Sequence, residues 1–361
     1  MPLSPLSALD PERFERPDIL KRLNAASRAL AELKGVAASI PNQSILINTL
    51  TLQEARDSSA IENIVTTQDD LYREDSPADA TATAIKEVLR YRQALRAGFE
   101  QVRDSGLLTL NTVLEIQQQL ESNRAGFRKL PGTALRDGGG RLVYAPPQDA
   151  DEVLRLMHEL ERFMHDDPGF AADPLVRMAL IDHQFESIHP FYDGNGRTGR
   201  IINVLYLVKE GLLDIPVLYL SRHVVRTKDD YYRRLQAVRD ADAWEDWVLY
   251  MLEAVAVTAT ETVATIQAIK RLLQETKQRV RSGYRFYSQD LINNLFNHPY
   301  TRVEFLQRDL GVTRLTATRY LDALARDGVL EKTRVGRNNY YINRPLFALL
   351  SGNQRGAREG A

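Results

Sequence analysis

Apolar residues recur at helical spacing along most of the chain, and this periodicity predicts a mainly α-helical protein. The part from 17 to 125 holds several such segments, and one of them, near 51–64, ends before a run of Thr, Gln and Asp residues typical of a helix start. Helix-breaking residues separate the segments, namely Pro41, Pro77 and Gly106. We therefore expect an N-terminal region built of helices.

One segment departs from this helical spacing. Two short arms, 132–137 and 141–145, flank three glycines at 138–140 that supply a turn, and Pro146 and Pro147 end the second arm. This pattern predicts a single β-hairpin in an otherwise helical region.

Two strongly apolar helices are expected after the hairpin. Asp173 and Pro174 form a typical helix start, with Asp as N-cap and Pro as first helical residue, and the segment to Ile188 is apolar on most sides. A second apolar helix follows from 200 to 210 and stops at Gly211. Such all-round apolar helices are expected in the interior of a bundle.

The remaining segments predict a long helix and a small separate module. The long helix covers about 257–281, with apolar residues along one side. From about 285 the pattern is helix, helix, turn, helix and a short hairpin that ends near Asn343.

Composition and charge narrow the class of protein. The 361 residues are enough for two or three domains, 43% are apolar, and a net charge of -1 gives no general attraction to nucleic acid or anionic membranes. The absence of cysteine excludes disulfides, thiolate catalysis and Cys-ligated zinc. No signal peptide and no run of about 18 apolar residues is found. We expect a soluble, cytoplasmic protein without membrane contact.

The short segment between the two apolar helices, 189–200, carries the chemistry of a phosphate site. Glycines let backbone N–H groups approach phosphate oxygens, and the start of a helix adds aligned donors. Two arginines can clamp phosphate, a carboxylate can hold Mg²⁺, and a histidine can take a proton near neutral pH. The segment supplies all of these groups: His189, Asp193, Gly194, Asn195, Gly196, Arg197, Gly199 and Arg200.

Two simpler interpretations fit less well. Asp-Gly and Asn-Gly pairs are typical of tight turns, but no alternating strand flanks this segment and a turn does not need two arginines facing an apolar seam. A metal site of His183, His189 and Asp193 is disfavoured because the two histidines do not share one helical face.

The segment HPFYDGNGRTGR resembles the signature of the Fic family, HPFx(D/E)GNGRxxR, at every specified position. The order of helices, hairpin, motif and Tyr231-Tyr232 is similar to that family over about 45–255. The resemblance implies a Fic-type helical bundle with a hairpin flap, and transfer of AMP from ATP to a hydroxyl of a target protein. The domain ranges expected are 1–110 (N-terminal helical region), 111–255 (catalytic core), 256–284 (connecting helix) and 285–361 (winged helix).

The resemblance assigns a role to each motif residue. His189 would deprotonate the acceptor hydroxyl, and Asp193 would hold Mg²⁺ between the α- and β-phosphates. Arg197 would contact the β-phosphate and Arg200 the γ-phosphate. Other implied nucleotide contacts are Gly194, Asn195, Gly196, Thr198, Gly199 and Tyr231, and the implied target-docking strand is Arg141, Leu142, Val143 and Tyr144.

Two positions qualify this assignment. Tyr231, taken alone, more often belongs to a hydrophobic core than to an adenine site. Arg239 stands where many relatives carry an Asn, and the nucleotide contact at that position stays open.

The segment from Ser58 to Asn63 resembles the family's inhibitory motif, (S/T)xxxE(G/N). Ser58 and Glu62 are one helical turn apart on the same face, a spacing that on its own usually indicates a solvated surface. The resemblance implies that Glu62 pairs with Arg200 and blocks the space of the γ-phosphate.

The C-terminal module resembles a winged helix-turn-helix with 313–326 as recognition helix. From 313 to 340 six basic residues, Arg337 among them, stand against three acidic ones, a modest excess for a DNA-binding surface. For this module, DNA contact and a packing or homodimer role both stay open. For the whole protein, two alternative functions stay open: a nucleotide-sensing transcription regulator, and a Fic enzyme that removes AMP or transfers another phosphate group.

Overall fold

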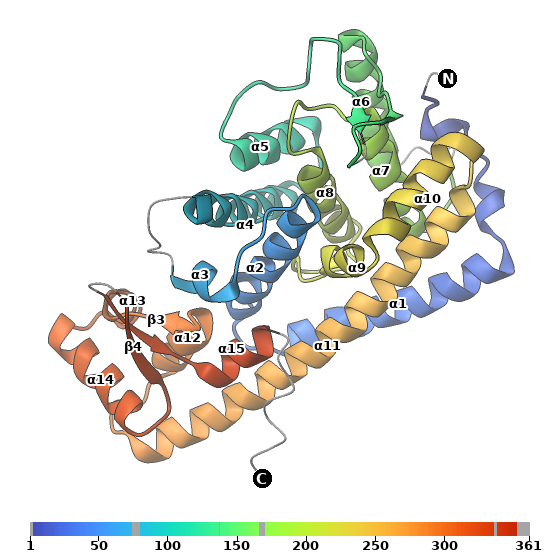
Figure 1. Ribbon diagram of the computed structural model, residues 1–361. Coiled ribbons are helices and arrows are strands. Elements are labelled where there is room, and N and C mark those ends of the chain that lie inside the picture. The colour runs from blue at the N-terminus through green and yellow to red at the C-terminus, as the bar shows by residue number, and fades with distance from the viewer. Residues whose placement is uncertain (1–2, 74–79, 137, 166–169, 336–337, 352–361) are drawn as a thin grey trace. The chain divides into compact units, whose positions relative to one another are not determined.

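The computed structural model describes residues 3–73, 80–136, 138–165, 170–335 and 338–351 (Figure 1). Helices dominate these residues, and the mainly α-helical fold predicted from the sequence is confirmed. The elements are η1 (Leu6–Ala8), η2 (Pro11–Phe14), α1 (Pro17–Ala38), α2 (Ser44–Ile61), α3 (Gln68–Arg73), α4 (Ala80–Ser105), α5 (Leu110–Glu121), β1 (Leu135–Arg136), β2 (Leu142–Tyr144), α6 (Ala150–Met164), α7 (Pro174–Ile188), α8 (Asn195–Lys209), α9 (Leu220–Arg226), α10 (Lys228–Ala241), α11 (Trp244–Gly283), α12 (Gln289–Asn297), β3 (Tyr300–Thr301), α13 (Val303–Leu310), α14 (Arg314–Arg326), β4 (Glu331–Val335), β5 (Asn338–Ile342) and α15 (Arg344–Leu350).

The contacts between residues group the chain into two compact units. The first comprises Met1–Lys34, Glu54–Val65 and Lys86–Thr260, and the second comprises Gly35–Gln53, Thr66–Ile85 and Glu261–Ala361. Four helices, α1, α2, α4 and α11, therefore contribute residues to both units. The domain ranges expected from the sequence stay a prediction.

The core of the first unit is the pair α7 and α8, which pack against each other, with α6 on α7 and α5 on α8. As predicted, α7 starts at Asp173, whose Oδ1 accepts from the Leu175 N–H at 2.8 Å, with Pro174 in the first turn. Every residue of α7 after Pro174 is buried, as its all-round apolar pattern predicts.

The second apolar helix begins five residues earlier than predicted. α8 starts at Asn195 instead of 200, because Gly194 adopts a left-handed backbone (φ 77°) as its N-cap and the rest of the motif continues as helix. The helix ends where predicted: Gly211 is left-handed (φ 67°), as expected at the C-terminal end of a helix.

The predicted hairpin is present but shorter. Strands β1 and β2 are antiparallel, with Leu135 opposite Tyr144 and Arg136 opposite Leu142, and their register is irregular. Arg141 therefore lies just outside the strand expected to start there. Asp137, in the predicted first arm, lies outside the described residues.

The second unit contains the predicted order of helices and hairpin. α12, α13 and α14 are followed by β4 and β5, and the sheet order is β3-β5-β4. Thr313 caps α14 by accepting from the Thr316 N–H at 3.3 Å. Residues 336–337 of the predicted wing lie outside the described residues, and α15, which follows the wing, was not predicted.

The long helix α11 runs over 40 residues, from Trp244 instead of about 257. By length and composition it could cross a membrane, with a mean hydropathy of 1.3 over 18 residues, but 56% of that window is buried within the protein. Core helices of soluble proteins meet the same criterion, so this feature is weak evidence for a membrane span.

Candidate functional site

The residues of the predicted phosphate site lie where α7 ends and α8 begins, in the first unit. His189 follows α7 directly and adopts a left-handed backbone (φ 49°), which a residue other than glycine rarely does. The side chain of Asn195 holds the connecting loop, since its Oδ1 accepts from the Phe191 N–H at 2.8 Å and its Nδ2 donates to the Phe191 carbonyl at 2.9 Å. Phe191 itself is fully buried and anchors the loop in the core.

The two glycines of this loop are in close contact with carboxylates. A Cβ on Gly196 would lie 2.8 Å from Oε1 of Glu62, and one on Gly194 would lie 2.5 Å from Oε1 of Glu121. No side chain fits at either position without displacing a carboxylate. An anionic group therefore already lies against each of the glycines expected to receive phosphate.

Glu62 bridges both arginines of the motif. Its Oε1 accepts from Nη2 of Arg200 at 2.8 Å and its Oε2 lies 2.7 Å from Nε of Arg197. Ser58 binds Arg200 as well, through its Oγ at 2.7 Å and its carbonyl at 3.1 Å. The predicted pairing of Glu62 with Arg200 is present, and Arg197 is a second partner that the sequence did not indicate.

Glu62 projects from the end of α2 instead of from its interior. The helix stops at Ile61, Asn63 is left-handed (φ 64°), and the Ile64 N–H donates to the Ser59 carbonyl at 3.0 Å, a common arrangement at helix ends. This termination directs the Glu62 carboxylate toward the motif.

Arg197 is surrounded by acidic side chains. Besides Glu62, its Nη2 donates to Oε1 of Glu121 at 2.8 Å and its Nη1 to Oε2 of Glu87 at 3.2 Å, while Asp193 lies at 4.0 Å. The Arg197 side chain is 4% exposed, and a buried guanidinium of this kind needs such partners. Burial raises the pKa of Glu121, whereas the adjacent Arg197 lowers it.

Asp193 is exposed, as is the neighbouring Tyr192. The Asp193 side chain is 77% exposed, and its Oδ1 accepts from the Gly194 N–H at 2.7 Å. Thr198 is fully buried. A Cβ on Gly199 would lie 3.1 Å from the Phe185 ring, so Gly199 allows α8 to pack closely on α7.

The imidazole of His189 is held in its neutral form. Burial lowers its pKa to about 4, assisted by the positive charges of Arg128 and Arg239. Its Nδ1 has no hydrogen-bond partner among the described residues. A neutral, partly exposed imidazole is the form that can accept a proton.

Tyr231 lies in the core. It is 4% exposed, its ring packs against Tyr232, Trp247 and Tyr250, and its hydroxyl donates to Asp182 at 3.5 Å. These contacts agree with the core position expected for Tyr231 when it is considered without the family resemblance. The adjacent Tyr232 is 46% exposed.

Buried acidic groups lie behind the site on α7. Burial raises the pKa of Asp182 to about 6 and that of Glu186 to about 7. Arg200 counteracts both shifts. His183, on the same helix, packs against Trp244 and Trp247 and belongs to the core.

The flap presents apolar side chains. Leu142 and Val143 are 58% and 42% exposed, and Tyr144 turns inward so that its hydroxyl donates to the Ser187 carbonyl at 3.0 Å. Behind it, η1, β2, α7 and α10 line a groove of about 670 Å³.

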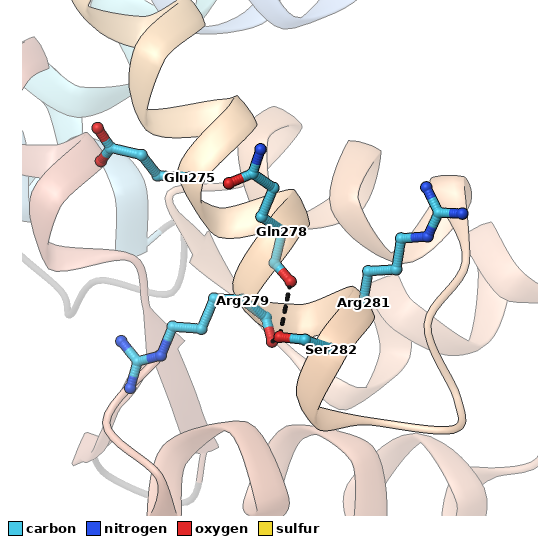
Figure 2. A pocket seen from close by; sticks show the side chains of 5 residues that line it. All are labelled: Glu275, Gln278, Arg279, Arg281 and Ser282. Atoms are coloured by element: carbon cyan, nitrogen blue, oxygen red, sulfur yellow. Dashed lines mark hydrogen bonds between the residues drawn. The ribbon is translucent and has the colours of Figure 1, made fainter.

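A second hollow, of about 780 Å³, lies on the last turns of α11 in the second unit (Figure 2). Ser282 donates there to the Gln278 and Arg279 carbonyls at 3.0 and 3.2 Å, and the Arg279 side chain binds the Gly328 carbonyl at 3.4 Å. It is open and lined by solvated polar side chains, so it supplies no reactive group comparable to His189.

Sequence reasoning missed three residues of the site. Glu121 and Glu87 contact Arg197, and Arg128 contacts the backbone at His189, yet each lies 61 or more positions away in the chain. No spacing rule connects such residues. Arg128 stands in a basic segment with Arg124 and Lys129, so the sequence does not single it out.

Three family models match the chain. They are Fic/DOC family N-terminal (residues 20–100), Fic/DOC family (107–207) and the C-terminal domain of SoFic-like protein adenylyltransferases (272–346). Together they account for most of the chain, and the middle one contains the motif, the flap and α7.

Curated proteins similar to this chain are named protein adenylyltransferases. The chain is 30% identical over 96 residues to protein adenylyltransferase fic-1 of Caenorhabditis briggsae, which covers 27% of this chain and 18% of that protein. It is 28% identical over 145 residues to protein adenylyltransferase Fic of Aedes aegypti, covering 39% and 26%. The chain thus spans about a fifth to a quarter of the length of these curated relatives.

Solved structures share the fold. A Fic family protein from Desulfovibrio desulfuricans matches with a TM-score of 0.57 and 22% identity over 91% of this chain and 96% of that one. Fic-1 from Caenorhabditis elegans matches with a TM-score of 0.54 and 18% identity over 71% and 74%.

Proposed function

The chain belongs to the Fic/DOC family, and on this basis we propose that it is a protein adenylyltransferase that moves AMP from ATP to a target protein. The acceptor is a Ser, Thr or Tyr hydroxyl, on another protein or on a second copy of this chain. The cytoplasmic location expected from the sequence stays a prediction.

The reaction needs a base, and in this proposal His189 acts as one. The neutral imidazole accepts the proton of the acceptor hydroxyl while that oxygen bonds to the α-phosphorus of ATP. The bond from the α-phosphorus to the oxygen that bridges the phosphates breaks, and pyrophosphate leaves. The protonated His189, partly exposed, then returns its proton to solvent.

The start of α8 would bind the phosphates. The N–H groups of its first turn, from Asn195 on, offer donors to phosphate oxygens, and Arg197 and Arg200 offer two guanidinium groups. Asp193 is the exposed oxygen ligand that fits Mg²⁺, which usually combines one or two carboxylates with phosphates and water. Among the described residues no group of three or more such side chains could hold a metal alone, so the nucleotide would share it. Bound Mg²⁺ would neutralise charge on the leaving pyrophosphate.

Glu62 keeps this site in an inactive state in our proposal. The observation that carries it is the double contact of Glu62 with Arg197 and Arg200, in which its carboxylate lies against Gly196. An ion held by two buried guanidinium groups competes directly with the terminal phosphates of ATP. ATP would then bind without its α-phosphorus in line with the acceptor.

The decisive test is a gain of activity in Glu62→Gly. We expect this variant to label itself or a lysate protein with AMP from α-labelled ATP and Mg²⁺ at least a hundredfold faster than the parent, because positioning terms reach several orders of magnitude. Since Glu62 follows the last residue of α2, glycine there costs less than the about 1 kcal/mol of a helix interior.

Two control variants make the test specific. Glu62→Gln keeps the size of the side chain and removes its charge, so it should release activity as well. Glu62→Gly with His189→Ala should lose about 10²–10⁴-fold, the usual contribution of a general base. Equal labelling by the parent and Glu62→Gly, both folded by circular dichroism, would remove the inhibitory role.

Removal of AMP is the second reaction to test, because Glu62 in its paired position could orient a water toward a bound AMP ester. Incubation of an AMP-labelled target with the parent and with Glu62→Gly separates the two activities. Release by the parent and not by Glu62→Gly would assign removal to the paired state.

A further inference from the structure

The carbonyl groups at the end of α7 lack donors within their own helix. Pro190 has no N–H, so the carbonyl four residues earlier, at 186, has no intrahelical partner. The next amide, at Phe191, donates to Oδ1 of Asn195 at 2.8 Å instead of to the carbonyl at 187. Carbonyls at a helix end need partners from elsewhere, and buried ones need them most.

Three residues from other segments supply partners for the carbonyls at 186–190, four of them through side chains and one through a backbone N–H. Arg239 of α10 donates to the Glu186 carbonyl at 3.2 Å, and Tyr144 of β2 donates to the Ser187 carbonyl at 3.0 Å. Arg128, which is 2% exposed, donates from Nη2 to the Ile188 carbonyl at 3.2 Å and from Nε to the His189 carbonyl at 2.8 Å. The backbone N–H of Arg128 donates to the Pro190 carbonyl at 2.8 Å. Five consecutive carbonyls around His189 are therefore satisfied from outside α7.

Arg128 and Arg239 also bind the flap, to which Tyr144 itself belongs. A nitrogen of Arg128 donates to the carbonyl of Pro147, which follows β2, and the guanidinium of Arg239 lies 3.9 Å from the centre of the Tyr144 ring. Nε of Arg239 also donates to Oγ of Ser187 at 3.0 Å. The position of the flap and the position of the His189 backbone are thus set by shared contacts.

We propose that Arg128, Tyr144 and Arg239, the capping triplet, are positioning residues that hold the His189 imidazole and the flap in one fixed relation. The proposal rests on the proposed function, because the flap is where a target segment would dock and His189 is the base. A hydroxyl presented from the flap strand would then lie within reach of the imidazole without a separate adjustment of α7.

Arginine suits position 128 for a geometric reason. Its planar guanidinium donates to three carbonyls in different directions, while a lysine has one nitrogen at the end of a flexible chain. The buried Arg128 side chain donates to neutral carbonyls, and burial lowers its pKa as expected for such surroundings.

The geometric part of the proposal is tested by hydrogen exchange on the full-length protein. We expect Arg128→Met to speed the exchange of amides in 142–144 and in 189–192 together, by at least tenfold. Arg124→Met removes an exposed arginine from the same segment and should leave both unchanged. Tyr144→Phe, which removes one donor and keeps the ring, should give a smaller increase in both segments. Faster exchange in only one of the two segments, or in neither, would overturn the coupling.

The kinetic part uses the Glu62→Gly protein as parent. We expect Arg128→Met to lower kcat for AMP transfer by at least tenfold, with the KM for ATP unchanged within threefold. The reason is that Arg128 binds the backbone of His189 and Pro190, and neither of these residues is proposed to bind phosphate. Arg128→Lys should recover part of kcat. An unchanged kcat in Arg128→Met, or a loss confined to the KM for ATP, would contradict a positioning role. If the Glu62→Gly parent transfers no AMP, the proposed function fails while the exchange experiment still decides the coupling.

Discussion

At the scale of single residues, the site is defined by how burial and charge act on His189. Burial is the main cause that lowers its pKa to about 4, and Arg128 and Arg239 add to it. A histidine in water has a pKa near 6.5 and would be about three-quarters protonated at pH 6. His189 stays neutral at that pH and is ready to act as a base.

The pH dependence of transfer follows from this shift. A depressed pKa means that protonation, and the loss of the base, occurs only when the pH falls toward about 4. We expect the initial rate of AMP transfer by Glu62→Gly to stay nearly constant from pH 8 to about 5 and to fall below that. Rates measured in buffers of equal ionic strength, with folding checked by circular dichroism, give the profile. Half-loss near pH 6.5 would show an unperturbed histidine.

Glu121 is the residue whose role the sequence did not suggest. Its carboxylate lies against Gly194 as Glu62 lies against Gly196, so a phosphate at Gly194 must displace or repel it. We expect Glu121→Gln, made in the Glu62→Gly protein, to tighten the binding of ATP about tenfold, which corresponds to ~1.4 kcal/mol.

The matched control for Glu121→Gln is Glu87→Gln. Glu87 contacts the same arginine, at 3.2 Å from Arg197 Nη1, whereas the atoms nearest to a Cβ on Gly194 all belong to Glu121. Calorimetric titration with a non-hydrolysable ATP analogue compares the two. An equal effect of both substitutions would assign the change to Arg197 and not to the space at Gly194.

At the scale of elements, the loop between α7 and α8 depends on one side chain. Asn195 is 3% exposed and satisfies both the N–H and the carbonyl of Phe191. In Asn195→Ala two buried backbone groups lose their partners, at about 1–3 kcal/mol each, so we expect a loss of about 2–6 kcal/mol in the free energy of unfolding.

Urea unfolding followed by circular dichroism measures this loss. Asn123→Ala is the matched control, because Asn123 is exposed and its Oδ1 accepts only from the nearby Ala125 N–H at 3.1 Å. A change of less than about 0.5 kcal/mol is expected there. If Asn195→Ala were equally mild, the loop would be held by Phe191 packing alone.

The elements also show what a sequence can predict. The motif, the start of α7 and the end of α8 depend on neighbouring residues, and all three were predicted. The start of α8 was missed because Gly194 and Gly196 disfavour helix, whereas the left-handed Gly194 begins one. α15 was missed although Asn343 and Pro345 form a typical helix start, with the Asn343 side chain accepting from the Leu346 N–H at 3.2 Å.

The contacts that no local rule reveals are those between distant segments. Arg128 reaches the His189 carbonyl across 61 positions, and Glu121 reaches Arg197 across 76. Their side chains look like ordinary surface charges in the sequence. Only the packing of α5 and the flap around the motif turns them into parts of the site.

At the scale of the whole molecule, the near-neutral net charge of -1 leaves binding to nucleic acid dependent on local charge in the C-terminal unit. There two basic side chains of the winged-helix region have acidic partners. Arg314 lies 3.1 Å from Glu304, and Lys332 lies 2.7 Å from Asp322. Leu315, at the start of α14, is 81% exposed and apolar, although the start of a recognition helix is where base contacts are made.

We therefore expect the full-length protein to bind duplex DNA no more tightly than about 10⁻⁴ M at physiological salt, the weak end of non-specific binding. Fluorescence anisotropy with a mixture of genomic fragments, repeated from low to physiological salt, measures this. The variant Glu304→Gln frees Arg314 and serves as the positive control for charge, since each added phosphate contact should steepen the salt dependence by about one. Tight binding by the parent that Arg314→Met and Arg319→Met both weaken, with a shallower salt dependence, would contradict this expectation and assign α14 to DNA.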